Sequence, residues 1–177
     1  MDTKRKGTFT LRTAAVLFVL SAMLEFVFWS TEVTLFGAIR GGAVAYAYHL
    51  LYAILYAVLG VGLWTAQRWA YPTVFATTAI CTVDNLQTIF SRDVIVEWQM
   101  QEMATIFDRL KQEMAGKEEL LQFMNKEELL RTMNMNRDSM LNAVVLLSVL
   151  FIACWWGFAW YTHLRRDYFK PGAGHSS

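Results

Sequence analysis

The sequence predicts an all-α polytopic membrane protein, a four-transmembrane-helix bundle with an extracytoplasmic helical hairpin between transmembrane helices three and four. Of its 177 residues, 55% are hydrophobic and only 18% are charged, which is too apolar for an ordinary soluble surface. The apolar residues gather in four blocks, each close to the ~20 residues that a helix needs to cross ~30 Å of hydrocarbon. These blocks lie around 13–36, 43–66, 72–90 and 141–162.

The same composition excludes several classes of function. A net charge of +1 offers no basic surface for nucleic acid, and four spans leave too little chain for a nucleotide-binding domain. Metal-binding spacings such as Cys-x-x-Cys or His-x-x-x-His are absent. Cys81 and Cys154 both fall within spans, which excludes the paired cysteines of a thiol oxidase. We expect no metal, no cofactor and no nucleic-acid partner.

The first segment, residues 1–12, is basic and is expected to lie in the cytoplasm. Basic residues also follow the second and fourth apolar blocks, and the full set is Lys4, Arg5, Lys6, Arg12, Arg68, Arg165, Arg166 and Lys170. The positive-inside rule then places both termini in the cytoplasm, with the spans in the plasma (inner) membrane. A signal peptide is a poor interpretation of the first block, because it runs past Glu25 without an Ala-x-Ala cleavage site.

Residues 13–90 are expected to form transmembrane helices one to three. The connections near 37–42 and 67–72 are short, so these helices should be antiparallel neighbours. The fourth transmembrane helix is expected at 140–163, and a basic cytoplasmic tail at 164–177. Aromatic residues at its inner end are expected to be interfacial anchors, namely Trp155, Trp156, Trp160 and Tyr161.

Residues 91–139 are predicted to form the extracytoplasmic hairpin, with its first helix continuing from transmembrane helix three. Apolar residues recur there at helical spacing on both sides of a break at Gly116. No cysteine is present in this segment, and two short apolar stripes bury little surface on their own. We therefore expect a partner-binding surface made by Trp98, Met103, Phe107, Leu110, Met114, Phe123 and Met124.

Three ionisable residues within the spans are the other candidate site. At a rise of ~1.5 Å per residue, Glu25, His49 and Asp84 fall at a similar depth in a ~30 Å slab. Tyr52 and Asn85 are expected to lie close enough to assist them. Ionisable groups in a bilayer need a partner or a purpose. The group can lock the helix register through protonated carboxyls, or it can move a proton or hold a cation.

The predicted order of elements resembles that of the tetraspanins, which have four spans, a small first outer loop and a larger outer domain between spans three and four. Tetraspanins carry a Cys-Cys-Gly motif and disulfides in that outer domain. No cysteine lies between Cys81 and Cys154 in this chain. The resemblance therefore implies topology alone, and it carries no function.

Three functional hypotheses follow. The leading one is an accessory or scaffold subunit that binds another membrane protein, or itself as a homo-oligomer, through the outer hairpin. The first alternative is a homo-oligomer that conducts protons or cations through Glu25, His49 and Asp84. The second is a membrane enzyme acting on a lipid or quinone, with the same three residues as acid, base and orienting group. Because no catalytic motif is present, we favour a non-enzymatic protein.

Overall fold

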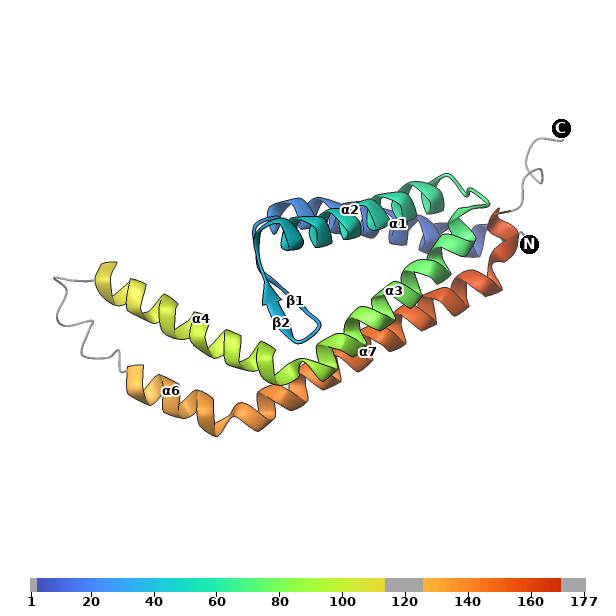
Figure 1. Ribbon diagram of the computed structural model, residues 1–177. Coiled ribbons are helices and arrows are strands. Elements are labelled where there is room, and N and C mark those ends of the chain that lie inside the picture. Colours follow the sequence, from blue (N-terminus) through green and yellow to red (C-terminus); the bar gives the residue numbers. More distant parts are fainter. Residues whose placement is uncertain (1–2, 114–125, 170–177) are drawn as a thin grey trace, which may run out of the picture. The chain divides into compact units, whose positions relative to one another are not determined.

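The computed structural model describes residues 3–113 and 126–169, and these residues are mostly helical (Figure 1). This confirms the prediction of a helical protein, with one short β-hairpin added. In chain order the elements are α1 (Thr3–Val27), β1 (Val33–Leu35), β2 (Ala38–Arg40), α2 (Gly42–Trp64), α3 (Ala70–Phe90), α4 (Arg92–Glu113), α6 (Lys126–Met135), α7 (Arg137–Leu164) and the 3₁₀-helix η1 (Arg166–Phe169).

Three helices in the described part of the chain are long and apolar enough to cross a membrane. The spans are Thr8–Val27, Gly42–Trp64 and Arg137–Leu164. Helix α3 is not among them, although it has 21 residues. Its sequence includes five threonines together with Asp84, Asn85 and Gln87, which lower its hydropathy. The predicted third span, and with it a total of four, therefore depends on a helix that length and composition alone do not select.

The connection between α1 and α2 differs from the prediction. The first apolar block is helical only to Val27, and the chain then forms the β1–β2 hairpin. Its turn contains Phe36 with φ of 51° and Gly37 with φ of 75°. Two successive positive φ angles are what a type I′ hairpin turn requires, and Phe is an uncommon residue there.

Gln87 of α3 holds this hairpin with both ends of its side-chain amide. The Nε2 group donates to the carbonyl oxygen of Thr34 at 3.2 Å. The Oε1 atom accepts from the backbone N–H of Phe36 at 3.1 Å. The polar end of α3 therefore satisfies backbone groups that the short hairpin cannot pair within itself.

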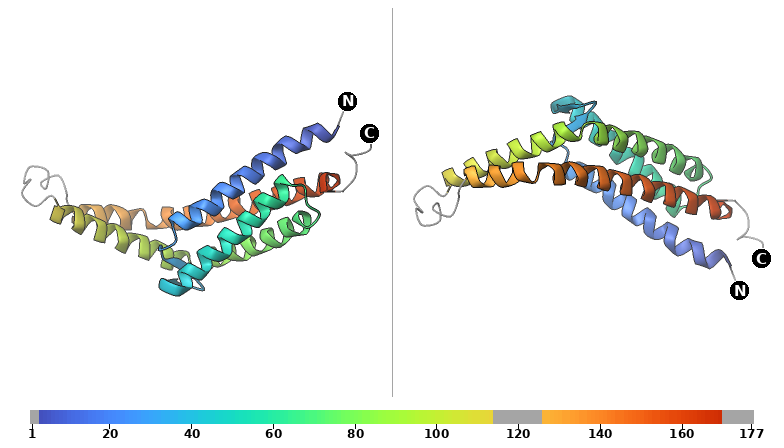
Figure 2. Two further views of the ribbon diagram at one scale, coloured as in Figure 1. Left: turned by 90° about the horizontal axis from the view of Figure 1, so that it is seen from above. Right: turned by 90° about the horizontal axis from the view of Figure 1, so that it is seen from below.

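The chain divides into two compact units. The first contains residues 1–33, 40–85 and 150–177, and the second contains 34–39 and 86–149. In the first unit α1 lies side by side with α2 (Figure 2). In the second unit α4 contacts α6.

Helices α1 and α2 approach closely because Gly60 has no side chain. A Cβ atom on Gly60 would lie 2.6 Å from Val19 Cγ2 and 3.0 Å from the carbonyl oxygen of Ala15. Small residues at such contacts are typical of helix packing in membranes. The surrounding core of the first unit comprises Leu11, Ala15, Leu59, Leu63, Ala70, Val74, Ala159 and Phe169.

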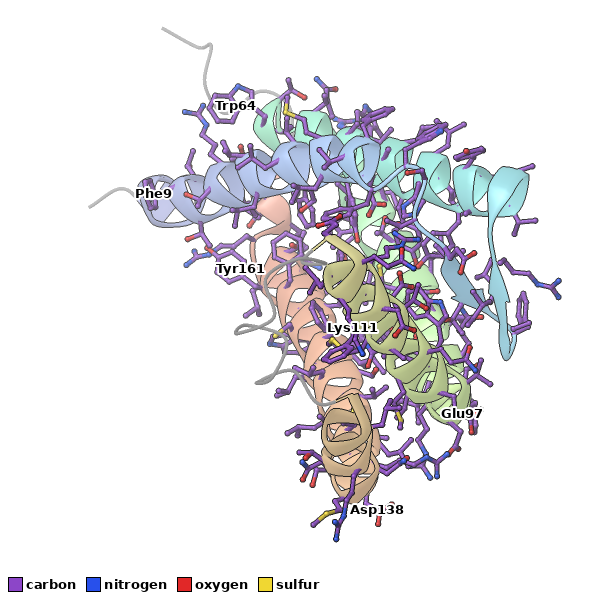
Figure 3. The ribbon with its side chains drawn as sticks, turned by 90° about the vertical axis from the view of Figure 1, so that its left-hand side faces the viewer. Phe9, Trp64, Glu97, Lys111, Asp138 and Tyr161 are labelled. Atoms are coloured by element: carbon purple, nitrogen blue, oxygen red, sulfur yellow. The ribbon has the colours of Figure 1, made fainter. Side chains whose placement is uncertain are left out.

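The C-terminal part of the first unit is tied back onto α2. Tyr168 of η1 donates its hydroxyl to the carbonyl oxygen of Leu63 at 2.9 Å. Trp64 closes α2 (Figure 3), and the Arg12 guanidinium carbon lies 5.5 Å from its ring centroid. A Trp paired with an Arg at a helix end is typical of a membrane–water interface.

The outward faces of the long apolar helices are uncovered. On α1 the exposed fractions are 46% for Val16, 51% for Leu20 and 60% for Met23, which share one face of the helix. Only 11% of the apolar window of α7 is buried. Apolar side chains exposed on this scale match a lipid solvent better than water.

In the second unit an arginine connects the start of α7 to α4. Arg137 Nη2 lies 3.2 Å from Asp93 Oδ1 and 3.3 Å from Glu97 Oε1. All three side chains are exposed, so we expect these ion pairs to add little stability. Val96 and Phe107 are the buried residues of α4.

Candidate functional site

Helix α2 carries a buried histidine that pairs with a carboxyl group of α1. His49 Nδ1 lies 2.7 Å from Glu25 Oε2, and the two side chains are 7% and 22% exposed. The other ring nitrogen, Nε2, lies 3.1 Å from the hydroxyl oxygen of Thr31 and 3.3 Å from its carbonyl oxygen. Both nitrogens of the imidazole are therefore engaged.

Thr31 fixes the hydrogen on one of these nitrogens. Its hydroxyl donates to the carbonyl oxygen of Phe28 at 2.7 Å, so this hydroxyl can only accept from the imidazole. A carbonyl oxygen is also only an acceptor, and Nε2 of His49 must therefore carry a hydrogen. Nδ1 then either donates to a Glu25 carboxylate or accepts from its carboxylic acid. Both arrangements share one proton and have no net charge, which lowers the cost of burial.

A second polar pair joins α2 to α3. The hydroxyl of Tyr48 donates to Asp84 Oδ2 at 2.8 Å. Tyr48 precedes His49 in the chain, so adjacent residues of α2 reach α3 and α1. Their rings are nearly perpendicular, with centroids 5.7 Å apart. Polar side chains thus join helix α2 to both α1 and α3 through hydrogen bonds.

Aromatic rings pack beside these pairs along α2. Tyr52 lies one turn beyond Tyr48, with ring centroids 4.7 Å apart, and Tyr56 follows at 5.7 Å. Trp155 of α7 stacks on Tyr56 at 6.5 Å and on Phe18 of α1 at 5.5 Å. Trp155 was expected as an interfacial anchor, and instead it packs among three helices. Trp156 and Trp160 are 50% and 65% exposed.

Of the five predicted polar residues, the structure places three in these two pairs. Glu25 and His49 meet directly, Asp84 binds Tyr48 instead, and Tyr52 packs on Tyr48. The side chain of Asn85 donates to the carbonyl oxygen of Cys81 at 2.8 Å, within its own helix. Whether these residues have a function beyond packing stays a prediction.

Two residues of this site, Tyr48 and Thr31, were missed by sequence reasoning. Tyr48 could have been found, because tyrosines recur every four residues at 48, 52 and 56 and so share one face of α2. Thr31 gave no such signal. It falls in the first apolar block, which was expected to be helical throughout, but the helix ends at Val27. Among the residues that the structure describes, no three His, Cys, Asp or Glu side chains are placed to hold a metal ion.

The predicted partner-binding residues of α4 do not share one environment. Phe107 is buried at 9% exposure and Trp98 is half-buried. Met103 and Leu110 are 45% and 43% exposed, and so is Ile106 between them at 44%. We call these last three residues the α4 row. The remaining predicted residues, Met114, Phe123 and Met124, lie outside the described residues.

Comparison with known protein families, with curated proteins and with solved structures finds no match. The geometry of the two polar pairs and of the α4 row therefore carries the functional argument.

Proposed function

We propose that the chain is an accessory or scaffold protein of four transmembrane helices that self-associates through α4. The observation that carries this proposal is the α4 row, in which three large apolar side chains are exposed on a helix with eight charged residues among its 22. Exposed apolar surface of this kind marks interaction sites. Helix α4 belongs to the segment that the proposal places outside the membrane, where lipid cannot cover the row.

Hydrogen bonds within α3 support its role as the third of the four spans. Several of its polar side chains donate to backbone carbonyl oxygens one turn earlier, namely Thr73, Thr78, Thr82 and Asn85. Asp84 is bonded to Tyr48 of α2. Polar groups satisfied in this way are tolerated in hydrocarbon, because no unmet donor or acceptor faces lipid. With both termini in the cytoplasm by the positive-inside rule, residues 91–139 then lie outside the plasma (inner) membrane.

The two polar pairs fit a structural role within such a scaffold. Glu25 is bonded to His49 and Asp84 to Tyr48, so each carboxyl group already has a partner in a neighbouring helix. Hydrogen bonds between membrane helices add stability and fix register. The pairs therefore support a structural role in which they hold α1, α2 and α3 in one arrangement.

The partner that binds to the α4 row is a second copy of the chain. Met103, Ile106 and Leu110 are spaced by three and four residues, which is the spacing of a coiled-coil seam. Glu102 and Arg109, seven residues apart, lie along one side of this seam. In an antiparallel pair with its two-fold axis near Ile106, Glu102 of one copy faces Arg109 of the other. The surface is therefore self-complementary.

Replacing Ile106 by glutamate is expected to weaken self-association at least about tenfold, because a charge would be buried at the centre of the seam. The measurement is the mass of the detergent-solubilised full chain by light scattering across a dilution series. Gln101→Glu is the matched control, since it adds the same charge on the opposite face of α4.

A charge exchange tests the antiparallel arrangement. Glu102→Arg should weaken the dimer, and the double variant Glu102→Arg/Arg109→Glu should restore it. A dimer that Ile106→Glu leaves intact would contradict the use of the α4 row. A single Glu102→Arg variant that the second change fails to rescue would contradict the antiparallel register.

A second candidate is proton or cation conduction by a homo-oligomer, and the shared proton between His49 and Glu25 favours it. A carboxyl group and an imidazole 2.7 Å apart can exchange a proton without creating net charge. No comparable observation favours an enzyme.

The conduction candidate predicts that Glu25→Gln lowers proton flux at least about tenfold in reconstituted vesicles, because the amide cannot release a proton. Flux is followed with a pH-sensitive dye under an imposed membrane potential. Glu32→Gln is the control, because Glu32 is exposed beyond the end of α1. Equal flux in the wild type, Glu25→Gln and Asp84→Asn would remove this candidate.

A further inference from the structure

Helices α3 and α7 form an aromatic groove that neither functional candidate uses. The groove has a volume of about 390 Å³ and is lined by Phe75, Trp156, Trp160 and His163. This volume lies within the ~300–1,000 Å³ of typical small-molecule sites. All four residues belong to the first compact unit.

The first and last lining residues of α7, Trp156 and His163, are each hydrogen-bonded to α3. At one end the indole N–H of Trp156 donates to the hydroxyl of Thr82 at 3.2 Å. At the other end the hydroxyl of Tyr71 lies 2.8 Å from His163 Nδ1. The lining residues of α7 run from Trp156 to His163, a separation of seven residues, so the groove extends about 10 Å along α7.

His163 supplies the hydrogen-bonding atom of the groove. Tyr71 engages Nδ1 and leaves Nε2 as the other polar atom of the ring. The indole ring of Trp160 lies against the imidazole, with centroids 5.9 Å apart and planes at 26°. The indole N–H of Trp156 is already used by Thr82. A ligand in the groove therefore meets flat apolar walls and one imidazole nitrogen.

We propose that the aromatic groove binds the ring of a lipid-soluble quinone. A planar ring stacks on Trp and Phe side chains with more contact than a flexible acyl chain achieves. One ring oxygen can bond to His163 Nε2, as a carbonyl if the nitrogen carries a hydrogen or as a quinol hydroxyl if it does not. The apolar tail stays in the bilayer, beside the uncovered face of α7. A phospholipid headgroup would instead call for several charged donors in the groove.

Quinone binding is tested with the full chain in nanodiscs of zwitterionic lipid, titrated with a decyl-substituted benzoquinone. The readout is quenching of tryptophan fluorescence, compared with a chain-matched decyl alcohol as competitor. Trp160→Leu and His163→Leu are each expected to raise the dissociation constant at least about tenfold. Trp64→Leu is the matched control, because Trp64 lies at the end of α2 outside the groove.

Each outcome decides the proposal. Because Trp160 is 65% exposed, its replacement leaves the core of the first unit intact, and an unchanged affinity in this variant would overturn the groove assignment. Decyl alcohol that reverses the quenching at a concentration equal to that of the quinone would show an acyl-chain groove and overturn the quinone assignment. Tenfold losses in both variants, with Trp64→Leu unchanged, would support it. Self-association through α4 does not enter this measurement.

Discussion

Replacing His49 by leucine is expected to lower the free energy of unfolding by about 3 kcal/mol, a cost reached both by a buried unpaired polar group and by a broken buried ion pair. Glu25 would lose the partner that lies 2.7 Å away, while its carboxyl group stays mostly covered at 22% exposure. Thr31 would lose the N–H that now donates to it. The measurement is reversible unfolding of the full chain in mixed micelles, with helicity followed by circular dichroism.

The double variant Glu25→Leu/His49→Leu separates lost pairing from lost packing. Removing both partners leaves no carboxyl group or imidazole buried without the other, so this variant should be more stable than His49→Leu alone. Glu25→Gln should fall between the wild type and His49→Leu, because its amide N–H can still donate to Nδ1. A double variant less stable than either single variant would contradict the pairing argument.

Helical periodicity is enough to tell which face of an apolar helix is buried. By spacing, His49 shares one face of α2 with Ala53 and Gly60, and it is 6% exposed. Val44 and Leu51 fall on the opposite face, and each is 48% exposed. A helix of 3.6 residues per turn relates sequence to direction so directly that one chain suffices.

Partners between helices could not be predicted in the same way. The helical rise placed Glu25, His49 and Asp84 at one depth, but depth says nothing of the rotation and spacing of neighbouring helices. Asp84 therefore pairs with Tyr48, a residue adjacent to the expected partner. Prediction from spacing has the same limit in α4. The spacing grouped Phe107 with Met103, but it could not tell which of the two side chains would be buried.

The residue at which α1 ends could not be predicted from the sequence either. Apolar residues continue past Val27 through Phe28 and Trp29, and a short apolar run does not distinguish a helix from a strand. The hairpin turn at Phe36 and Gly37 lacks the Asn-Gly or Asp-Gly signal of its type. The amide of Gln87, which bonds to the hairpin from another helix, supplies a constraint that no local pattern contains.

Replacing Gly60 by alanine is expected to destabilise the first unit by about 1–3 kcal/mol, although alanine is the better helix former by ~1 kcal/mol. The new Cβ would lie 2.6 Å from Val19 Cγ2 and 3.0 Å from the carbonyl oxygen of Ala15. A backbone oxygen and a stiff β-branched side chain cannot move aside cheaply, so α1 and α2 must separate. The same mixed-micelle unfolding measures the loss.

Gly157 of α7 provides the matched control, because a Cβ atom there would meet nothing within 4 Å. Gly157→Ala should leave stability unchanged or raise it by up to ~1 kcal/mol through helix propensity. Adding Val19→Ala to Gly60→Ala removes the nearer of the two contacts, so it should recover part of the loss. If Gly60→Ala proved as stable as Gly157→Ala, the close approach of α1 and α2 would be wrong, and so would the placement of Glu25 beside His49 that depends on it.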